Sequence, residues 1–119
     1  MDIVRSVLAR ALAAGASDVH FEPTARTMEV RFRLDGILQT VETLPQTVAE
    51  SVVSRLKVLA GVLTYRNDLP QEGRIELADL PAEQGPQRIR ELRLATFPTL
   101  HGQRAVVRVF ASDSRLRTL

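Results

Sequence analysis

The sequence contains no cysteine and no tryptophan, and only 4% of its residues are aromatic. Without cysteine the chain forms no disulfide and offers no thiolate, which suits a reducing compartment. Because aromatic residues are scarce, aliphatic side chains must fill the core. No apolar run approaches the roughly 20 residues that cross a bilayer, and Arg5 and Arg10 interrupt the N-terminal apolar pattern, unlike in a secretory signal. We therefore predict a soluble, cytoplasmic protein.

The common catalytic motifs are also missing. The sequence has no G-x-S-x-G, H-E-x-x-H or G-x-x-x-x-G-K-[ST], which excludes a nucleophile elbow, a zinc helix and a phosphate loop. His20 and His101 lack the closely spaced partners of a metal shell, so no metal site is predicted. The carboxylates have no spacing that forces a pair together. We therefore predict that this chain alone is not an enzyme.

Lysine is nearly absent as well, since Lys57 is the only one in the chain. The pI near 9.9 is typical of nucleic-acid binders, yet the formal net charge is only +2. The basic character comes from arginine, whose planar fork suits phosphate and carboxylate partners. Because lysine and aromatic stacking platforms are scarce, nucleic-acid binding is the weakest of three functional hypotheses.

Two stretches show helical periodicity. In the first, Asp2 is a candidate N-cap, apolar residues recur over 3–12 and Gly15 is a suitable C-terminal residue. The second is predicted over 47–60, with a capping box formed by Thr47 and Glu50. Its apolar residues trace one face, and Arg55 and Lys57 are expected to point elsewhere.

Alternation with a period of two predicts strands. Residues 28–34 alternate apolar and charged side chains and end at Asp35-Gly36, a hairpin turn signal, before a strand over 37–43. We predict further strands over 19–21, 74–77, 88–96 and 104–110. An interruption over 97–102 separates the last two of these strands. Residues 64–73 and 78–86 are predicted loops, and strands 74–77 and 88–96 are predicted hairpin partners. The predicted class is α+β, with one core in 119 residues.

Arginines on the predicted strands are Arg31, Arg33, Arg74, Arg93, Arg104 and Arg108. Such residues usually line the wet face of a sheet. Arg93 and Arg108 fit this interpretation least well, because Arg108 shares its face with Val106 and Phe110, and Arg93 lies beside Ala95. A charge among apolar neighbours requires a partner.

Five blocks carry a family resemblance. They are GASDVHFEP at 15–23, VRFRLDGIL at 30–38, SRLKVLAG at 54–61, PQEGRI at 70–75 and TFPTLHGQR at 96–104. In order and spacing they resemble the domain that precedes the ATPase core in type II secretion and type IV pilus assembly ATPases. The resemblance implies a PAS-like antiparallel sheet with two main helices packed on it over 1–110. It implies that 111–119 are a linker toward a missing C-terminal RecA-like ATPase domain.

The resemblance also implies a function. Such a domain is a non-catalytic part of a hexameric ATPase, closes over ATP held by the C-terminal domain and couples hydrolysis to domain motion. The positions that match phosphate contacts are Arg93 and Arg108, with Arg74 and Arg104 as second-tier candidates. ATP and Mg²⁺ are then cofactors of the parent protein, and the fragment alone binds neither.

The implied partners are the C-terminal ATPase domain of the same or a neighbouring subunit and the inner-membrane platform proteins of a secretion or pilus machine. The parent is then a cytoplasmic homo-hexamer, peripheral to the inner membrane, that binds no nucleic acid. Two positions depart from the family pattern, since Gln103 replaces an acidic residue and Glu72 an aspartate. A stand-alone PAS-like module that binds a ligand or a protein stays open as the alternative, and the sequence does not choose between secretion and pilus assembly.

Overall fold

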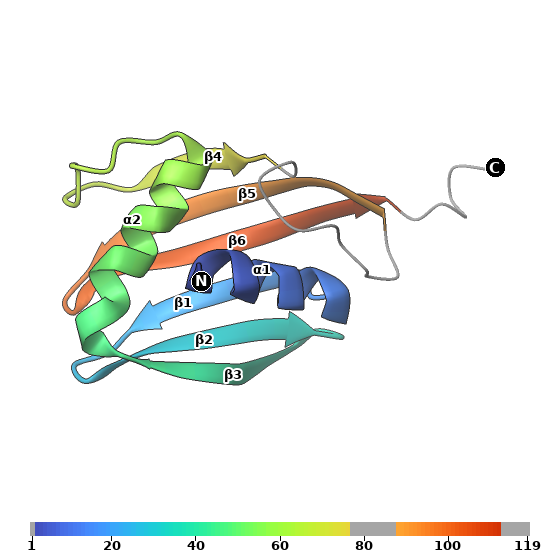
Figure 1. The fold of residues 1–119 in the computed structure, drawn as a ribbon, viewed down its shortest axis with the longest axis horizontal. Coiled ribbons are helices and arrows are strands. Elements are labelled where there is room, and N and C mark those ends of the chain that lie inside the picture. The colour runs from blue at the N-terminus through green and yellow to red at the C-terminus, as the bar shows by residue number, and fades with distance from the viewer. Residues whose placement is uncertain (1, 77–87, 113–119) are drawn as a thin grey trace.

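A computed structural model describes residues 2–76 and 88–112, with side chains for 2–76 and 91–110. Two helices lie on one face of a six-stranded sheet, as Figure 1 shows. The strand order is β3-β2-β1-β6-β5-β4 and every neighbouring pair is antiparallel. This confirms the predicted α+β class. In chain order the elements are α1 Ile3–Ala14, β1 Asp18–Pro23, β2 Thr27–Leu34, β3 Ile37–Pro45, the 3₁₀ turn η1 Gln46–Val48, α2 Ala49–Ala60, β4 Gln71–Ile75, β5 Arg88–Thr99 and β6 Gly102–Ser112.

The first helix has the predicted caps. Asp2 Oδ1 accepts hydrogen bonds from the amides of Val4 (3.0 Å) and Arg5 (3.4 Å), and Gly15 ends α1 in the left-handed conformation with a φ of 77°. The predicted capping box of the second helix is wrong. Pro45 leads into η1, so the backbone is already helical at Val48, and α2 begins at Ala49 without a side-chain cap.

The hairpin between β2 and β3 turns at Asp35 and Gly36, whose φ angles are 51° and 79°. Positive φ at both positions matches the twist of the flanking strands, as the sequence predicts. β4 and β5 are the predicted antiparallel partners. The predicted interruption over 97–102 is wrong, because residues 97–99 of β5 pair with residues 102–104 of β6 and only Leu100 and His101 turn. β4 likewise begins at Gln71, inside a predicted loop, and the predicted loop over 78–86 lies outside the described residues.

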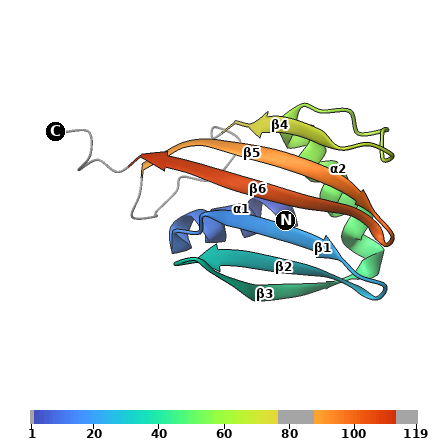
Figure 2. The same ribbon diagram turned by 180° about the vertical axis from the view of Figure 1, so that it is seen from behind.

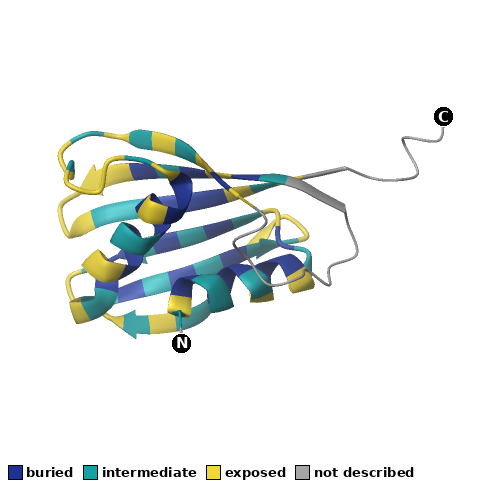
Figure 3. Ribbon diagram, turned by 45° about the horizontal axis from the view of Figure 1, so that its top comes forward, coloured by how far each residue is buried: buried dark blue, intermediate teal, exposed yellow. Residues whose placement is uncertain are grey.

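One apolar cluster fills the space between the helices and the sheet. Figure 3 shows its origin, since the strands alternate buried and less buried residues and the helices bury their inner faces. Val4, Leu8, Val53 and Leu56 contribute from the helices. The described helices have 12 residues each, and none of them is long and apolar enough to span a membrane.

Lys57 was predicted to point away from the apolar face of α2. This prediction is wrong, because the exposed fraction of Lys57 is 0%. Its Nζ donates hydrogen bonds to the carbonyl oxygen of Arg66 (2.6 Å) and to Asn67 Oδ1 (3.4 Å). Burial lowers the pKa of this ammonium group below its usual range. Lys57 therefore ties α2 to the loop that follows it, instead of pointing to solvent.

Candidate functional site

The face of the sheet opposite the helices is open, as the view from behind in Figure 2 shows. Strand alternation brings charged side chains to this face while their neighbours enter the core. The six strand arginines all lie on it, which confirms that they line the wet face. The residues of this open face are Asp18, His20, Glu22, Glu29, Arg31, Arg33, Glu72, Arg74, Glu91, Arg93, Ala95, Phe97, Arg104, Val106, Arg108 and Phe110.

Register places five of these residues in a single row across five strands. Arg33 of β2 pairs with Asp18 of β1, Asp18 pairs with Arg108 of β6, Arg108 with Arg93 of β5, and Arg93 with Arg74 of β4. We call these five residues the arginine row. Because neighbouring strands are about 4.8 Å apart, the row is roughly 19 Å long. All of its residues except Arg74 line a hollow of about 760 Å³ in the open face.

Asp18 is the only acid in the arginine row. Its Oδ1 accepts hydrogen bonds from Ser17 Oγ (2.8 Å) and Arg33 Nε (3.2 Å), and its Oδ2 contacts His20 Nε2. Burial opposes ionisation of this carboxyl, but the hydrogen bonds from Ser17 and His20 and the charge of Arg33 outweigh burial and hold the pKa of Asp18 below its usual range. An ionised carboxylate only accepts hydrogen bonds, so His20 Nε2 carries a proton here.

Arg93 has two neighbours that hold its guanidinium group. Its Nε donates to Glu91 Oε2, which raises the pKa of Arg93 above its usual range, and its Cζ lies 5.8 Å from the ring centroid of Phe110. Arg74 Nε lies 3.8 Å from the other oxygen of Glu91. Glu91 therefore lies between two arginines of the row and neutralises part of their charge.

Arg108 is different, because it is exposed and lies directly opposite Arg93. Within the part of the chain whose side chains are described, no carboxylate forms an ion pair with Arg108. Like charges on facing positions repel each other, which raises the free energy of the sheet. An anion bound between Arg93 and Arg108 would relieve this repulsion.

Three of the four predicted site residues come together in the structure, since Arg74, Arg93 and Arg108 occupy neighbouring strands. Arg104 lies four residues from Arg108 along β6, opposite Phe97 of β5. Its Cζ is 5.3 Å from the Phe97 ring and its Nε is 3.7 Å from Glu22. Gln103 forms no ion pair and instead donates from Nε2 to Asn67 Oδ1 (2.9 Å).

Asp18, Glu91 and Phe110 were not predicted as site residues. Strand alternation was the available signal, because residues 91, 93 and 110 fall on the open face by the same period that places Arg108 there. Within the described residues, no group of three His, Cys, Asp or Glu side chains is placed to hold a metal ion.

A family profile described as "Type II/IV secretion system protein" matches residues 1–118. The chain is 37% identical over 111 residues to the "Type IV pilus assembly ATPase PilB" of Pseudomonas aeruginosa, covering 93% of this chain and 19% of that protein. It is 34% identical over 116 residues to the "Type IV pilus assembly ATPase TfpB" of Acinetobacter baylyi, covering 98% and 19% respectively. For the "Type II secretion system ATPase E" of Vibrio cholerae the identity is 35% over 112 residues, covering 94% and 21%. The chain thus spans about a fifth of the length of these relatives.

A solved structure has a similar fold. The crystal structure of the pilus retraction motor PilT with bound ADP matches 95% of this chain and 30% of its own, with a TM-score of 0.62 and 15% sequence identity. A likeness at this identity concerns the fold alone. The fold, the profile match and the relatives all agree with the family resemblance of the five sequence blocks. The chain belongs to the type II/IV secretion system family, the family of the type II secretion and type IV pilus assembly ATPases.

Proposed function

We propose that this chain is the domain that precedes the ATPase core of a secretion or pilus assembly ATPase, and that Arg93 and Arg108 contact the phosphates of ATP held by the C-terminal domain of the same or a neighbouring subunit. The observation that carries the proposal is the direct opposition of these arginines on β5 and β6, with no carboxylate paired to Arg108 among the described side chains. Arg74 extends the same positive row by one strand. The names of the relatives as ATPases support nucleotide as the anion.

The chemistry explains why arginines are suited to this position. Phosphoryl transfer spreads negative charge over the oxygens of the transferred group, and a guanidinium fork donates paired hydrogen bonds to such oxygens. An arginine supplied by another domain stabilises that charge in the transition state and accelerates the reaction by about 10³-fold to 10⁵-fold. Mg²⁺ and the phosphate loop then belong to the C-terminal domain.

Coupling follows from the same arrangement. If the arginine row binds ATP only when the two domains close, nucleotide binding favours the closed state and product release favours the open state. We propose that the parent is a cytoplasmic hexamer that uses this motion at an inner-membrane platform. Residues 111–119 then lead toward the ATPase domain.

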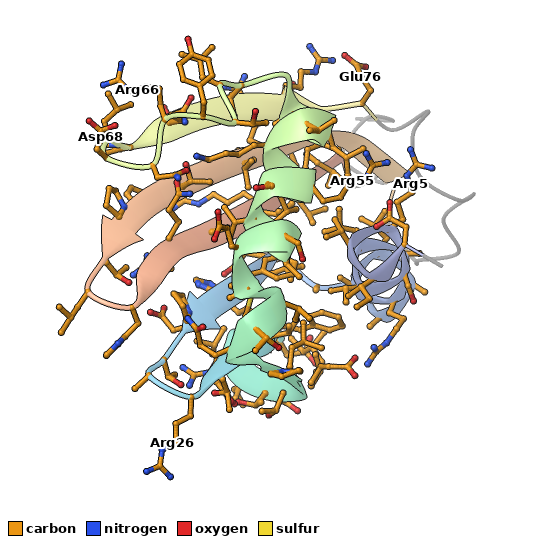
Figure 4. All side chains as sticks on the ribbon, turned by 60° about the vertical axis from the view of Figure 1, so that its left-hand side comes forward. Arg5, Arg26, Arg55, Arg66, Asp68 and Glu76 are labelled. Atoms are coloured by element: carbon orange, nitrogen blue, oxygen red, sulfur yellow. The ribbon has the colours of Figure 1, made fainter. Side chains whose placement is uncertain are left out.

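Substitution in the full-length parent tests the proposal. Arg93→Ala and Arg108→Ala are each expected to lower ATP turnover by about 10³-fold, because each removes a charge that stabilises the transition state. Arg26→Ala is the matched control, since Arg26 is exposed and points away from the sheet at the turn between β1 and β2 (Figure 4). The steady-state rate of phosphate release is the measurement, with gel filtration to check assembly.

Ordinary turnover in both arginine variants would contradict the proposed contacts. The 119-residue chain alone is expected to hydrolyse no ATP, which the same assay measures. Saturable ATP binding by this chain in calorimetry would favour the alternative of a stand-alone ligand-binding module.

A further inference from the structure

Asp18 and Arg108 face each other on β1 and β6 without forming an ion pair. The amide of Val109 donates to the carbonyl oxygen of Ser17 (2.9 Å), so Asp18 and Arg108 form a non-hydrogen-bonded pair, the position in which facing side chains are closest. Opposite charges at such positions attract each other and normally pair. The separation of these two groups therefore requires a cause.

The cause is competition for the oxygens of Asp18. Ser17 Oγ and Arg33 Nε donate to Oδ1, at 2.8 Å and 3.2 Å. Oδ2 contacts His20 Nε2 and lies 3.4 Å from Arg33 Nε. A carboxylate has about four lone-pair positions, and three donors already use both oxygens, with the single Nε hydrogen of Arg33 shared between them.

We propose that Ser17, His20 and Arg33 hold the Asp18 carboxylate away from Arg108, so that the Arg108 guanidinium stays available to a phosphate group. His20 and Arg33 are then positioning residues, because they act on the nucleotide only through Asp18 and Arg108. This inference rests on the proposed function of Arg108. It adds a specific task for the His20 side chain, which metal binding does not explain.

The contrast with Arg93 supports this assignment. Arg93 is held by Glu91 and by the ring of Phe110, so its guanidinium is oriented but partly neutralised. Arg108 faces the Asp18 carboxylate across β1 and β6, but the oxygens of this carboxylate already accept from other donors. The site thus combines one arginine that a carboxylate orients with one arginine that forms no ion pair among the described side chains.

His20 offers the sharpest test because its side chain is only 18% exposed and contacts Asp18 from the same strand. In the full-length ATPase, His20→Ala frees Oδ2 for Arg108, and kcat/KM for ATP is expected to fall about fivefold, the effect of one partly exposed ion pair. His20→Gln, whose amide also donates a hydrogen bond, is expected to retain most of the activity. In an Asp18→Asn background, His20→Ala is expected to have no further effect, because a neutral amide does not form an ion pair with Arg108.

Thr43→Ala is the matched control, since Thr43 Oγ1 donates to the carboxylate of Glu29 (3.2 Å) on the same face, away from any facing arginine. Thermal unfolding of each variant checks the fold. Wild-type kcat/KM in His20→Ala, or a defect that persists in the Asp18→Asn background, would overturn this inference alone. Ordinary turnover in Arg108→Ala would overturn the proposed function and this inference together.

Discussion

Lys57 brings a charge into the interior from a helix whose pattern is otherwise apolar on that side. Helical spacing places it one turn from Val53 and Ala60, both of which are buried. Most lysines lie at the surface, and Lys57 was accordingly predicted to point away from the apolar face. The partners that make burial acceptable are the Arg66 carbonyl and Asn67, and they come from a loop that no helical period describes.

Replacing Lys57 is expected to destabilise the fold. Lys57→Ala removes the hydrogen bonds from Nζ to the Arg66 carbonyl, which keeps only Gln71 Nε2 as a donor, and to Asn67, and it creates a cavity. The free energy of unfolding is therefore expected to fall by about 2–4 kcal/mol. Lys57→Met fills the space and is expected to lower the free energy of unfolding by less than Lys57→Ala. Urea denaturation followed by circular dichroism gives both values, and an unchanged midpoint for Lys57→Ala would show that the buried hydrogen bonds contribute nothing.

The same residue predicts a pH dependence. Burial lowers the pKa of Lys57 in the folded state, so between that pKa and the ordinary value of 10.5 the unfolded chain binds more protons than the folded one. The free energy of unfolding of the wild type, relative to Lys57→Met, should therefore rise as the pH approaches 10.5. Urea titrations between neutral and alkaline pH measure this difference, and a flat difference would contradict the lowered pKa.

At the scale of elements, Asp2 joins the two helices. Its Oδ1 caps α1, and its Oδ2 accepts a hydrogen bond from Arg55 of α2 (2.9 Å). Figure 4 shows Arg5 and Arg55 pointing into the same region between the helices. Burial opposes ionisation, but the bonds from Arg55 and from the amides of Arg5 and Val4 outweigh it and hold the pKa of Asp2 below its usual value.

Asp2→Ala is expected to lower the free energy of unfolding by about 1–2 kcal/mol, because it removes both the cap and the ion pair. Asp2→Asn keeps a capping oxygen and should lose less. The difference in the free energy of unfolding between wild type and Asp2→Asn should be fully present above pH 3.8, the ordinary pKa of an aspartate. It should disappear as the pH falls through the lower pKa that Asp2 has in the folded state. Urea titrations at several acidic pH values measure it, and a difference independent of pH would contradict the ion pair.

Elements were predictable where a local pattern decides them. The caps of α1 and the Asp35-Gly36 turn depend on single residues and their own backbone, and both are as predicted. The bounds of other elements depend on strand pairing. Residues 97–99 contain a proline and suggest a break, yet the facing residues of β6 keep them in the sheet. Likewise, the sequence could place Arg93 and Arg108 on one face, but only register shows that they face each other.

For the molecule as a whole, one core joins both helices to the sheet. Met28 lies within it at 0% exposure. We expect the chain to unfold in a single cooperative transition, because among the described elements none has a core separate from this one. The methyl resonance of Met28 and the far-ultraviolet circular dichroism should therefore lose half their native signal at the same urea concentration. Distinct midpoints would indicate that a part of the fold opens first.

Because the arginines lie on one hydrogen-bonded sheet, they are expected to move together as a rigid unit. Arg74, Arg93 and Arg108 sit on hydrogen-bonded neighbouring strands, so none of them shifts far without tilting the others. Gly102 is six residues from Arg108 along β6, or about 20 Å at about 3.4 Å per residue. A tilt of about 10° around Arg108 therefore displaces the Leu100 hairpin tip by about 3–4 Å over this length. If phosphate binding tilts the arginine row, a small shift of the guanidinium groups would therefore produce a displacement of several ångströms at the Leu100 hairpin.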